Sequence, residues 1–250
     1  MSGTGTRTAL DVLKLLADDT RWQLVRALRT SDYQVGELVE RLQQPQNLVS
    51  YHLGLLRQAG LVHIHRSEAD ARVLYYGLDF QAVQTAFGQL GAALQLQAPL
   101  ATQQLPAPLV VFLCTGNSAR SQMAEGWLRQ ISGGRVLVRS AGTQPRAIHP
   151  LAVRVMHEAG VDIGYQHSKG IGEIATEQPS VVVTVCDRAR EACDSRLDAP
   201  VQLHWSIPDP VRAITPEADS VAAFRTTRDD LRVRVAGLLA ALPELAKPTQ

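Results

Sequence analysis

A cysteine followed by a short loop, an arginine and a serine is the part of this sequence best suited to chemistry. Cys114 follows the apolar run 109–113, and residues 115–119 separate it from Arg120, where an amphipathic segment begins. A strand that leads into a helix N-terminus lies where open α/β sheets bind ligands. Successive backbone N–H groups can surround a tetrahedral oxyanion there, and a guanidinium can bind two of its oxygens. We therefore expect Cys114 to be a thiolate nucleophile in an oxyanion-binding loop formed by Thr115, Gly116, Asn117, Ser118, Ala119, Arg120 and Ser121.

Two further cysteines, Cys186 and Cys193, lie in the same half of the sequence, and the first hundred residues contain none. Cys186 ends the apolar run 180–186, and Cys193 follows seven residues later. Neighbouring parallel strands would bring Cys186 to the sheet edge of Cys114, within reach of thiol exchange. The first residues lack the apolar core of a signal peptide, so we expect a cytoplasmic protein. Cysteines in that compartment more often serve redox or metal chemistry than structural disulfides.

The segment around Cys114 resembles the low-molecular-weight phosphatase family and the arsenate reductases built on that fold. The alternative is a buried, unreactive cysteine beside a surface arginine. It is disfavoured because unreactive cysteines lie in apolar surroundings rather than in anion-binding loops. With Cys186 and Cys193 included, the order and spacing of the thiols are similar to those of the thioredoxin-coupled arsenate reductases, over residues 109 to about 242.

This resemblance implies a relay of disulfides. Cys114 would attack arsenic, and Cys186 would attack the Cys114 adduct and release arsenite. Cys193 would then attack the new disulfide and leave a Cys186–Cys193 bridge for thioredoxin. Arsenate and thioredoxin are the expected partners. We expect no tightly bound cofactor and no metal, because the histidine pair His63 and His65 has no further ligands nearby in the sequence.

The resemblance also implies roles outside the loop. Asp209, between two prolines after the run 201–205, would protonate the departing oxygen; a purely turn-stabilising Asp is the alternative. Asn117, Glu125 and Ser140 fall where related reductases build a polar network that steadies the loop. Some relatives complete that network with potassium and an Asp. Here Lys169 takes that position, and its ammonium would replace the ion unless it is a solvated surface lysine.

Three departures from the phosphatase pattern favour a small inorganic oxyanion. Ala119 stands where the phosphatases usually carry a second cysteine, and Gln122 replaces their usual proline. Val211 and Arg212 stand where they usually have aromatics that hold phosphotyrosine. Weak phosphatase activity remains open because the loop and the acid are shared.

The first part of the chain has a helical pattern instead. Apolar residues recur three or four apart in residues 9–17, 21–28, 35–42 and 47–59, which predicts four short helices. Thr20 and Pro45 suit helix starts, and Gly60 suits a left-handed helix stop. The runs 61–65 and 73–77 predict a hairpin around the turn 67–70, followed by a long helix from residue 81 to about 96.

Residues 16–21 and 45–62 resemble the ArsR family of winged-helix repressors, and the resemblance covers residues 8–97. It implies a homodimer that reads a DNA operator with dyad symmetry through the helix 47–59. No cysteine occurs in this part, which excludes a thiolate arsenite site there. Because positive and negative side chains are nearly balanced in this part of the chain, a helical interaction domain remains an alternative. Our candidates for DNA contact are Asn47, Ser50, Tyr51, His52, Arg57, Arg66 and Arg72.

The elements that must position these residues predict two domains joined by a linker. Residues 98–108 are uncharged and rich in Gln, Ala and Pro. Beyond them, strands at 109–113, 136–139, 180–186 and 201–205 alternate with helices at 118–131, 150–159 and 221–242. The predicted fold class is therefore a mainly α winged helix-turn-helix domain in residues 1–97, followed by an α/β domain in residues 109–250. The α/β domain would be low-molecular-weight phosphatase-like, with a four-stranded parallel sheet covered on both faces.

The functional hypothesis is an arsenate reductase fused to a DNA-binding regulator of arsenic-resistance transcription. Two alternatives remain open. One is a repressor whose second half only senses an oxyanion or a redox state, and the other is a tyrosine phosphatase fused to a repressor.

Overall fold

The computed structural model describes residues 9–93, 108–192, 197–212 and 217–245. By contacts the chain divides into two units. The first is Met1–Arg66 with Arg72–Thr102, and the second is Ser67–Ala71 with Gln103–Gln250. The change at residues 102 and 103 falls inside the segment that the sequence predicts as a linker. The grouping of Ser67–Ala71 with the second unit was not predicted.

The first unit contains the expected helices and hairpin. Its helices are α1 (Ala9–Leu16), α2 (Asp19–Leu28), α3 (Val35–Leu42), α4 (Gln46–Gln58) and α5 (Phe80–Ala93), and its strands are β1 (Val62–Arg66) and β2 (Leu74–Leu78). Thr20 was the wrong choice for the start of α2, because the side chain of Asp18 caps this helix by accepting a hydrogen bond from Arg21 N at 3.0 Å. Pro45 precedes α4 as expected, and Gly60 has a φ of +72°.

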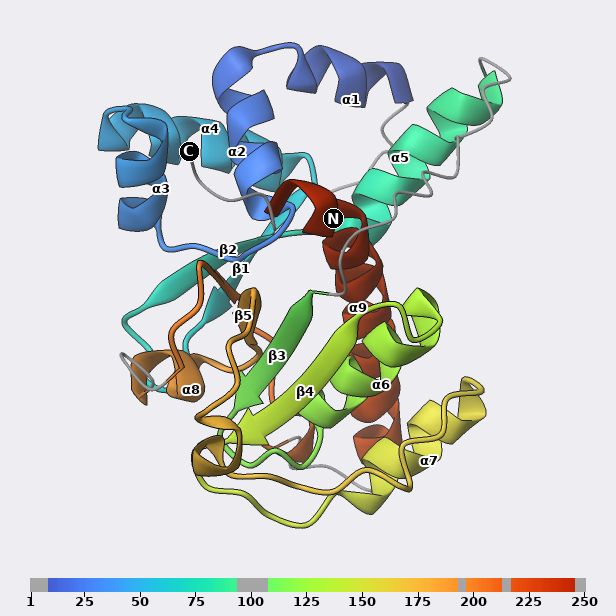
Figure 1. The fold of residues 1–250 in the computed structure, drawn as a ribbon. Coiled ribbons are helices and arrows are strands. Elements are labelled where there is room, and N and C mark those ends of the chain that lie inside the picture. The colour runs from blue at the N-terminus through green and yellow to red at the C-terminus, as the bar shows by residue number, and fades with distance from the viewer. Residues whose placement is uncertain (1–8, 94–107, 193–196, 213–216, 246–250) are drawn as a thin grey trace. The chain divides into compact units, whose positions relative to one another are not determined.

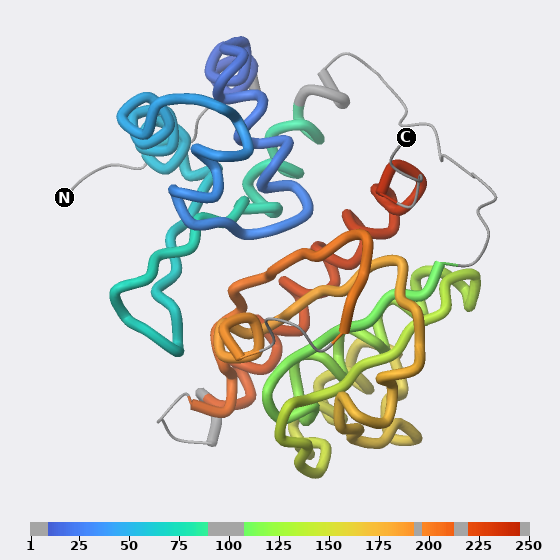
Figure 2. Tube along the Cα trace, turned by 60° about the vertical axis from the view of Figure 1, so that its left-hand side comes forward, coloured from blue at the N-terminus to red at the C-terminus, as the bar shows by residue number. Residues whose placement is uncertain are grey.

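Apolar faces of the helices meet in one core, to which the strands contribute Val62 and Leu78. Leu24, Leu28, Leu38, Val49 and Leu56 are fully buried there. The strands β1 and β2 are antiparallel, with Val62 opposite Leu78 and Arg66 opposite Leu74. In Figure 2 they run outward from the helices of this unit as a long hairpin. The helix-hairpin-helix order is therefore as predicted, with the strands displaced by one residue.

The second unit is an α/β domain. It contains β3 (Leu109–Cys114), α6 (Arg120–Ser132), β4 (Leu137–Gly142), α7 (Pro150–Glu158), η1 (Ile171–Ile174), β5 (Val181–Thr184), α8 (Asp187–Ala192), β6 (Val201–His204), η2 (Pro210–Arg212) and α9 (Glu217–Leu245). Within the described residues, four parallel strands form one sheet in the order β4-β3-β5-β6. Because β3 and β5 are neighbours, their carboxyl ends meet at one edge, as predicted.

Alternating side chains of the central strands supply both faces of this sheet. Val110 and Phe112 pack with α6, α7 and α9 on one face, whereas Val111 and Leu113 pack with η1 and Leu197 on the other. Figure 1 shows α6 and α9 against the same side of β3 and β4. The second face is thus covered largely by short and irregular segments. The prediction that both faces are covered is correct.

Several predicted boundaries differ from the structure, and two of these differences have a clear physical reason. Helix α6 begins at Arg120 rather than at residue 118, because the backbone up to Ala119 forms the loop around Cys114. Strand β4 continues to Gly142 rather than stopping at residue 139. Its last residues, Ser140 to Gly142, have weak strand propensity, but they pair with Phe112 to Cys114. Helix α8 was not predicted at all.

No helix in the described part of the chain combines the length and the apolar character that crossing a membrane requires.

Candidate active site

Cys114 is the last residue of β3. The loop that follows it is held by hydrogen bonds from the segment after β4. The carbonyls of Cys114, Thr115, Gly116 and Ser118 accept N–H groups from the segment 143–149 at 2.8–3.2 Å. In a planar trans peptide the next N–H points away from the carbonyl. The loop N–H groups therefore face inward, and that of Asn117 donates to Cys114 Sγ at 3.0 Å. This is the arrangement that binds an anion over a thiolate.

Two backbone features allow the chain to adopt this tight loop conformation. Asn117 has a φ of +44°, a left-handed conformation that Asn tolerates better than most residues. Gly142, at the end of β4, lies so close that a Cβ there would come within 2.6 Å of Thr115 O and 2.8 Å of Asn117 N. A larger residue at position 142 would push the loop out of shape.

A buried polar network holds Asn117, and it contains the residues that were predicted for it, Glu125, Ser140 and Lys169. Asn117 Nδ2 donates to Ser140 Oγ at 2.8 Å, and Ser140 Oγ donates to Glu125 Oε2 at 2.6 Å. Lys169 N donates to Asn117 Oδ1 at 2.7 Å, and its Nζ lies 3.8 Å from Glu125 Oε2. Lys169 is 8% exposed, so it is not a solvated surface lysine.

Gln122 belongs to the same network, a role that was not predicted from the sequence. Its Nε2 donates to Asn117 O at 3.1 Å, Asn117 Oδ1 at 2.9 Å and His167 O at 3.1 Å. The residue is fully buried. The amide that replaces the phosphatases' usual proline thus fixes the left-handed residue of the loop. Its place in the sequence, where the phosphatases usually have proline, was the signal that could have revealed this role.

Arg120 and Asp209 line the same pocket as Cys114. Arg120 is 7% exposed, and its Nη1 donates to Ile207 O at 2.7 Å while its Nη2 lies 3.5 Å from Asp209 Oδ2. Burial lowers the pKa of Arg120, but the negative groups around it, including Cys186, Glu68 and Asp209, outweigh burial and raise the pKa. Asp209 Oδ1 also accepts Val211 N at 3.2 Å, so the carboxylate contacts both the pocket and its own turn.

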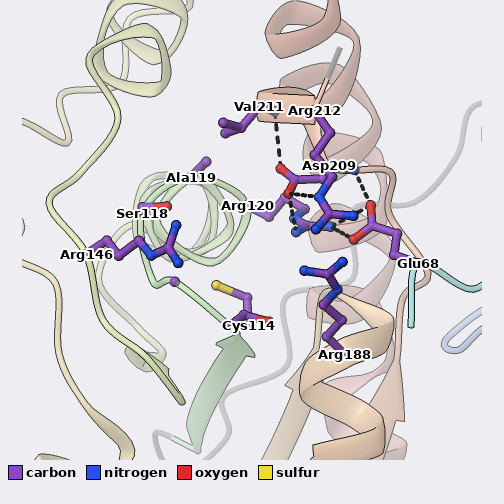
Figure 3. A pocket seen from close by; sticks show the side chains of 12 residues that line it. Glu68, Cys114, Ser118, Ala119, Arg120, Arg146, Arg188, Asp209, Val211 and Arg212 are labelled. Atoms are coloured by element: carbon purple, nitrogen blue, oxygen red, sulfur yellow. Dashed lines mark hydrogen bonds and ion pairs between the residues drawn. The ribbon is translucent and has the colours of Figure 1, made fainter. Parts of the chain in front are cut away.

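These groups line a pocket of about 300 Å³ above Cys114. Figure 3 shows Arg120 and Asp209 beside each other, with Arg146 and Arg188 on either side of Cys114. Arg146, Arg188, Arg212 and Glu68 also line the pocket, and of these only Arg212 was expected near the substrate, in place of an aromatic that holds phosphotyrosine. The three additional arginines are exposed and lie on loops and short helices, where sequence patterns carry little information about tertiary position.

Cys186 is buried two residues after the end of β5, where the Cys114 loop contacts it. Its Sγ lies 3.5 Å from Thr115 Oγ1 and 3.4 Å from Ala189 N in the first turn of α8. Burial raises the pKa of Cys186 and the nearby Cys114 adds to this, while Arg120, Thr115 and Ala189 lower it; the net direction is upward. The third predicted thiol, Cys193, lies outside the described residues.

A buried pair next to Cys186 was also missed. Asp187 Oδ1 lies 3.1 Å from His204 Nε2, and His204 Nδ1 lies 2.8 Å from Thr184 Oγ1. Both Asp187 and His204 are almost completely buried, at 1% and 0% exposure. The pair ties the first residue of α8 to the end of β6. A histidine that ends an apolar strand was the only sequence signal for it.

The residues proposed to contact DNA divide into two groups. Asn47, Ser50, Tyr51 and Arg57 are exposed on α4, and Arg66 and Arg72 are exposed beside the hairpin turn. His52 is 6% exposed, with its Nδ1 3.4 Å from Arg21 Nη1 and 3.6 Å from Asp18 Oδ1. The expectation that His52 contacts DNA was therefore wrong, because its side chain is buried against Arg21 and Asp18.

Comparisons with known proteins match both units. Residues 109–247 match the family described as low molecular weight phosphotyrosine protein phosphatase, and residues 18–63 match the bacterial regulatory protein, arsR family. Arsenate reductases of Halalkalibacterium halodurans and Bacillus subtilis are 38% and 39% identical over 127 residues, which is 51% of this chain and 91% of each relative. A solved structure described as an arsenate reductase in oxidized state is 30% identical, with a TM-score of 0.48, and the match covers 54% of this chain and 98% of that one.

Proposed function

The chain belongs to the low-molecular-weight phosphotyrosine protein phosphatase family, and from this premise we propose that its second unit reduces arsenate to arsenite. The relatives named as arsenate reductases support this substrate. The observation that carries the proposal is the second thiol: Cys186 lies against Thr115 of the loop that surrounds Cys114. A phosphatase needs the loop and an acid, but it has no use for a second thiol at this place.

In the proposed reaction, arsenate binds to the inward N–H groups of the loop and to Arg120. Cys114 thiolate attacks arsenic, and one arsenate oxygen leaves as water after Asp209 donates a proton. Cys186 thiolate then attacks Cys114 Sγ, so that a sulfur–sulfur bond forms and the sulfur–arsenic bond breaks. The electron pair of that bond stays on arsenic, which becomes arsenic(III) in arsenite.

Regeneration requires two electrons from outside. Cys193 attacks Cys186 in the Cys114–Cys186 disulfide and releases Cys114 thiolate. The resulting Cys186–Cys193 disulfide is reduced by the dithiol of thioredoxin, which becomes oxidised. This step rests on the spacing of the cysteines, since Cys193 lies outside the described residues.

Steady-state turnover tests the proposal directly. The full chain with thioredoxin, thioredoxin reductase and NADPH should consume NADPH in proportion to added arsenate. Cys114→Ala should abolish consumption, whereas Cys193→Ala should complete at most one turnover and still bind the oxyanion. A fully active Cys193→Ala variant refutes the relay. NADPH consumption that does not increase with added arsenate refutes the proposed arsenate reductase activity.

The rate of aryl phosphate hydrolysis, compared with the rate of arsenate reduction, distinguishes a phosphatase from an arsenate reductase. The residues at the pocket entrance disfavour tyrosine phosphatase activity. Val211 and Arg212, both exposed at the pocket, replace the aromatics that would hold a phosphotyrosine ring. We expect hydrolysis to be slower than arsenate reduction and independent of Cys193. Faster hydrolysis than reduction identifies the chain as a phosphatase.

For the first unit we propose DNA binding as a homodimer, supported by the arsR family match. The exposed face of α4 offers polar and aromatic groups to a major groove. Leu10 and Leu13 of α1 and Phe87 of α5 are 56%, 37% and 40% exposed, which suits a surface covered by a second copy. Sedimentation of the full chain, with Leu10→Glu/Phe87→Glu as the variant, tests the dimer. A monomeric wild-type chain refutes it.

A further inference from the structure

Glu68 is an acidic side chain in a pocket otherwise suited to an anion. It lies in the turn between β1 and β2, in the segment Ser67–Ala71 of the second unit. Its Oε2 lies 3.2 Å from Arg120 Nη1, and its Oε1 accepts Asp209 N at 2.5 Å. The side chain is 12% exposed. Figure 3 shows the carboxylate beside Asp209 and Arg120, at the wall of the pocket that contains Cys114.

Contacts with α8 hold this segment in place. Glu68 N donates to Asp187 Oδ2 at 2.8 Å, and Ser67 Oγ donates to Glu191 Oε1 at 2.9 Å. Ser67 Oγ also accepts Ala69 N at 3.1 Å, which closes the turn on itself. Glu68 therefore contacts Arg120 from a turn that is held by the backbone N–H of Glu68 and by the side chain of Ser67.

The charges around Arg120 explain what such a carboxylate would do. The guanidinium is the buried cation of the pocket floor, and both Glu68 and Asp209 already pair with it. A tetrahedral oxyanion needs the same cation and is repelled by the same carboxylates. An oxyanion therefore binds better when Glu68 withdraws or loses its charge.

We propose that Glu68 is an internal competitor for the oxyanion, an acidic residue that pairs with Arg120 in the empty pocket and lowers its affinity for arsenate and phosphate. The inference rests on the proposed oxyanion site and adds to it a residue that sets its affinity. By its charge, Glu68 restricts the pocket to anions that interact with the loop strongly enough to displace it.

Binding of inorganic phosphate to the full chain, measured by calorimetry, tests this without chemical turnover. Glu68→Gln removes the charge and keeps an oxygen that can accept Asp209 N, and Glu68→Ala removes both. Both variants should bind phosphate about tenfold more tightly than the wild type. The matched control is Asp70→Asn, which removes one charge from the same turn at a residue outside the pocket and should change affinity less than twofold.

Several outcomes overturn the inference. Unchanged or weaker binding by both Glu68 variants means that Glu68 only positions the Asp209 loop. Equal tightening by Asp70→Asn means that overall charge, not the contact with Arg120, sets the affinity. In both cases phosphate binding by the wild type leaves the proposed function standing. If wild type and variants all fail to bind phosphate, the inference and the proposed oxyanion site fail together.

Discussion

Lys169 Nζ lies 3.8 Å from Glu125 Oε2, and the two residues are 8% and 3% exposed. Lys169 Nζ also donates to His167 O at 3.0 Å. The ammonium therefore has a carboxylate and a carbonyl oxygen as neighbours, which are the ligands that a potassium ion prefers. Because Glu125 accepts Ser140 Oγ, and Ser140 accepts Asn117, this cation stands at the end of the network that steadies the loop.

If the ammonium replaces an ion, Lys169→Ala should make the protein depend on potassium. The variant leaves buried Glu125 with Arg129 as its remaining cation in the network, so we expect a loss of about 1–3 kcal/mol in the free energy of unfolding in NaCl. Potassium chloride should restore part of that loss and part of the turnover. Thermal unfolding in the two salts measures the effect.

Arg129→Ala is the control for Lys169. It removes the other cation on Glu125 from a position that is 33% exposed, where water can replace it. Its stability should be the same in both salts, as should that of the wild type. A Lys169→Ala variant that is equally stable in NaCl and KCl contradicts the role of Lys169 as a substitute ion.

The sequence predicted this site well where chain neighbours or strand ends determine position. Cys114, Arg120 and the loop between them are consecutive, and Cys186 meets them because parallel strands end at a common edge. Glu68 and the Asp187–His204 pair could not be predicted in the same way. Their partners are 52 residues and 17 residues away, and no periodicity links them. His52 was placed wrongly although its spacing from Val49 and Leu56, three and four residues away, puts it on the buried face of α4.

Thr115→Val should slow the attack by Cys186. The Thr115 hydroxyl lowers the pKa of Cys186, whereas burial raises it. Without the hydroxyl the pKa rises further, so a smaller fraction of Cys186 is thiolate at any given pH. The rising limb of turnover against pH should therefore move to higher pH, with about a tenfold loss at neutral pH and little change in phosphate affinity.

Thr115→Ser is the matched control, since it retains the hydroxyl. Its pH profile should stay close to that of the wild type. The idea is wrong if the valine variant keeps the wild-type profile, or if it loses phosphate binding as well, because the latter indicates a damaged loop.

The Asp209→Asn variant tests whether Asp209 acts as the general acid or only stabilises its turn. Asparagine keeps an oxygen that can accept Val211 N, so the turn and the thermal stability should be preserved. It cannot donate the proton that the leaving oxygen requires, and the first-order rate of arsenate reduction should fall about 100-fold. Single-turnover kinetics at saturating arsenate measure this rate. Wild-type activity in the variant would leave Asp209 with only its structural role.

Tyr51 and His52 are adjacent on α4 but have opposite environments, with exposures of 61% and 6%. Tyr51→Ala should weaken binding to a DNA duplex selected with the wild-type chain and leave the melting temperature unchanged. His52→Ala should lower the free energy of unfolding by about 1–2 kcal/mol, and with it the melting temperature, because it removes the contacts with Arg21 and Asp18. DNA binding of the folded variant should change less than for Tyr51→Ala.

Arg57 extends this test to the phosphate backbone. Exposed on α4, it should contribute electrostatically, so Arg57→Ala should weaken binding to all duplexes and reduce the slope of log affinity against log salt by about 1. Fluorescence anisotropy over a range of KCl concentrations gives this slope. If no duplex can be selected with the wild-type chain, or if Tyr51→Ala and Arg57→Ala bind like the wild type, the face of α4 is not a DNA-reading surface. The first unit is then a helical interaction domain.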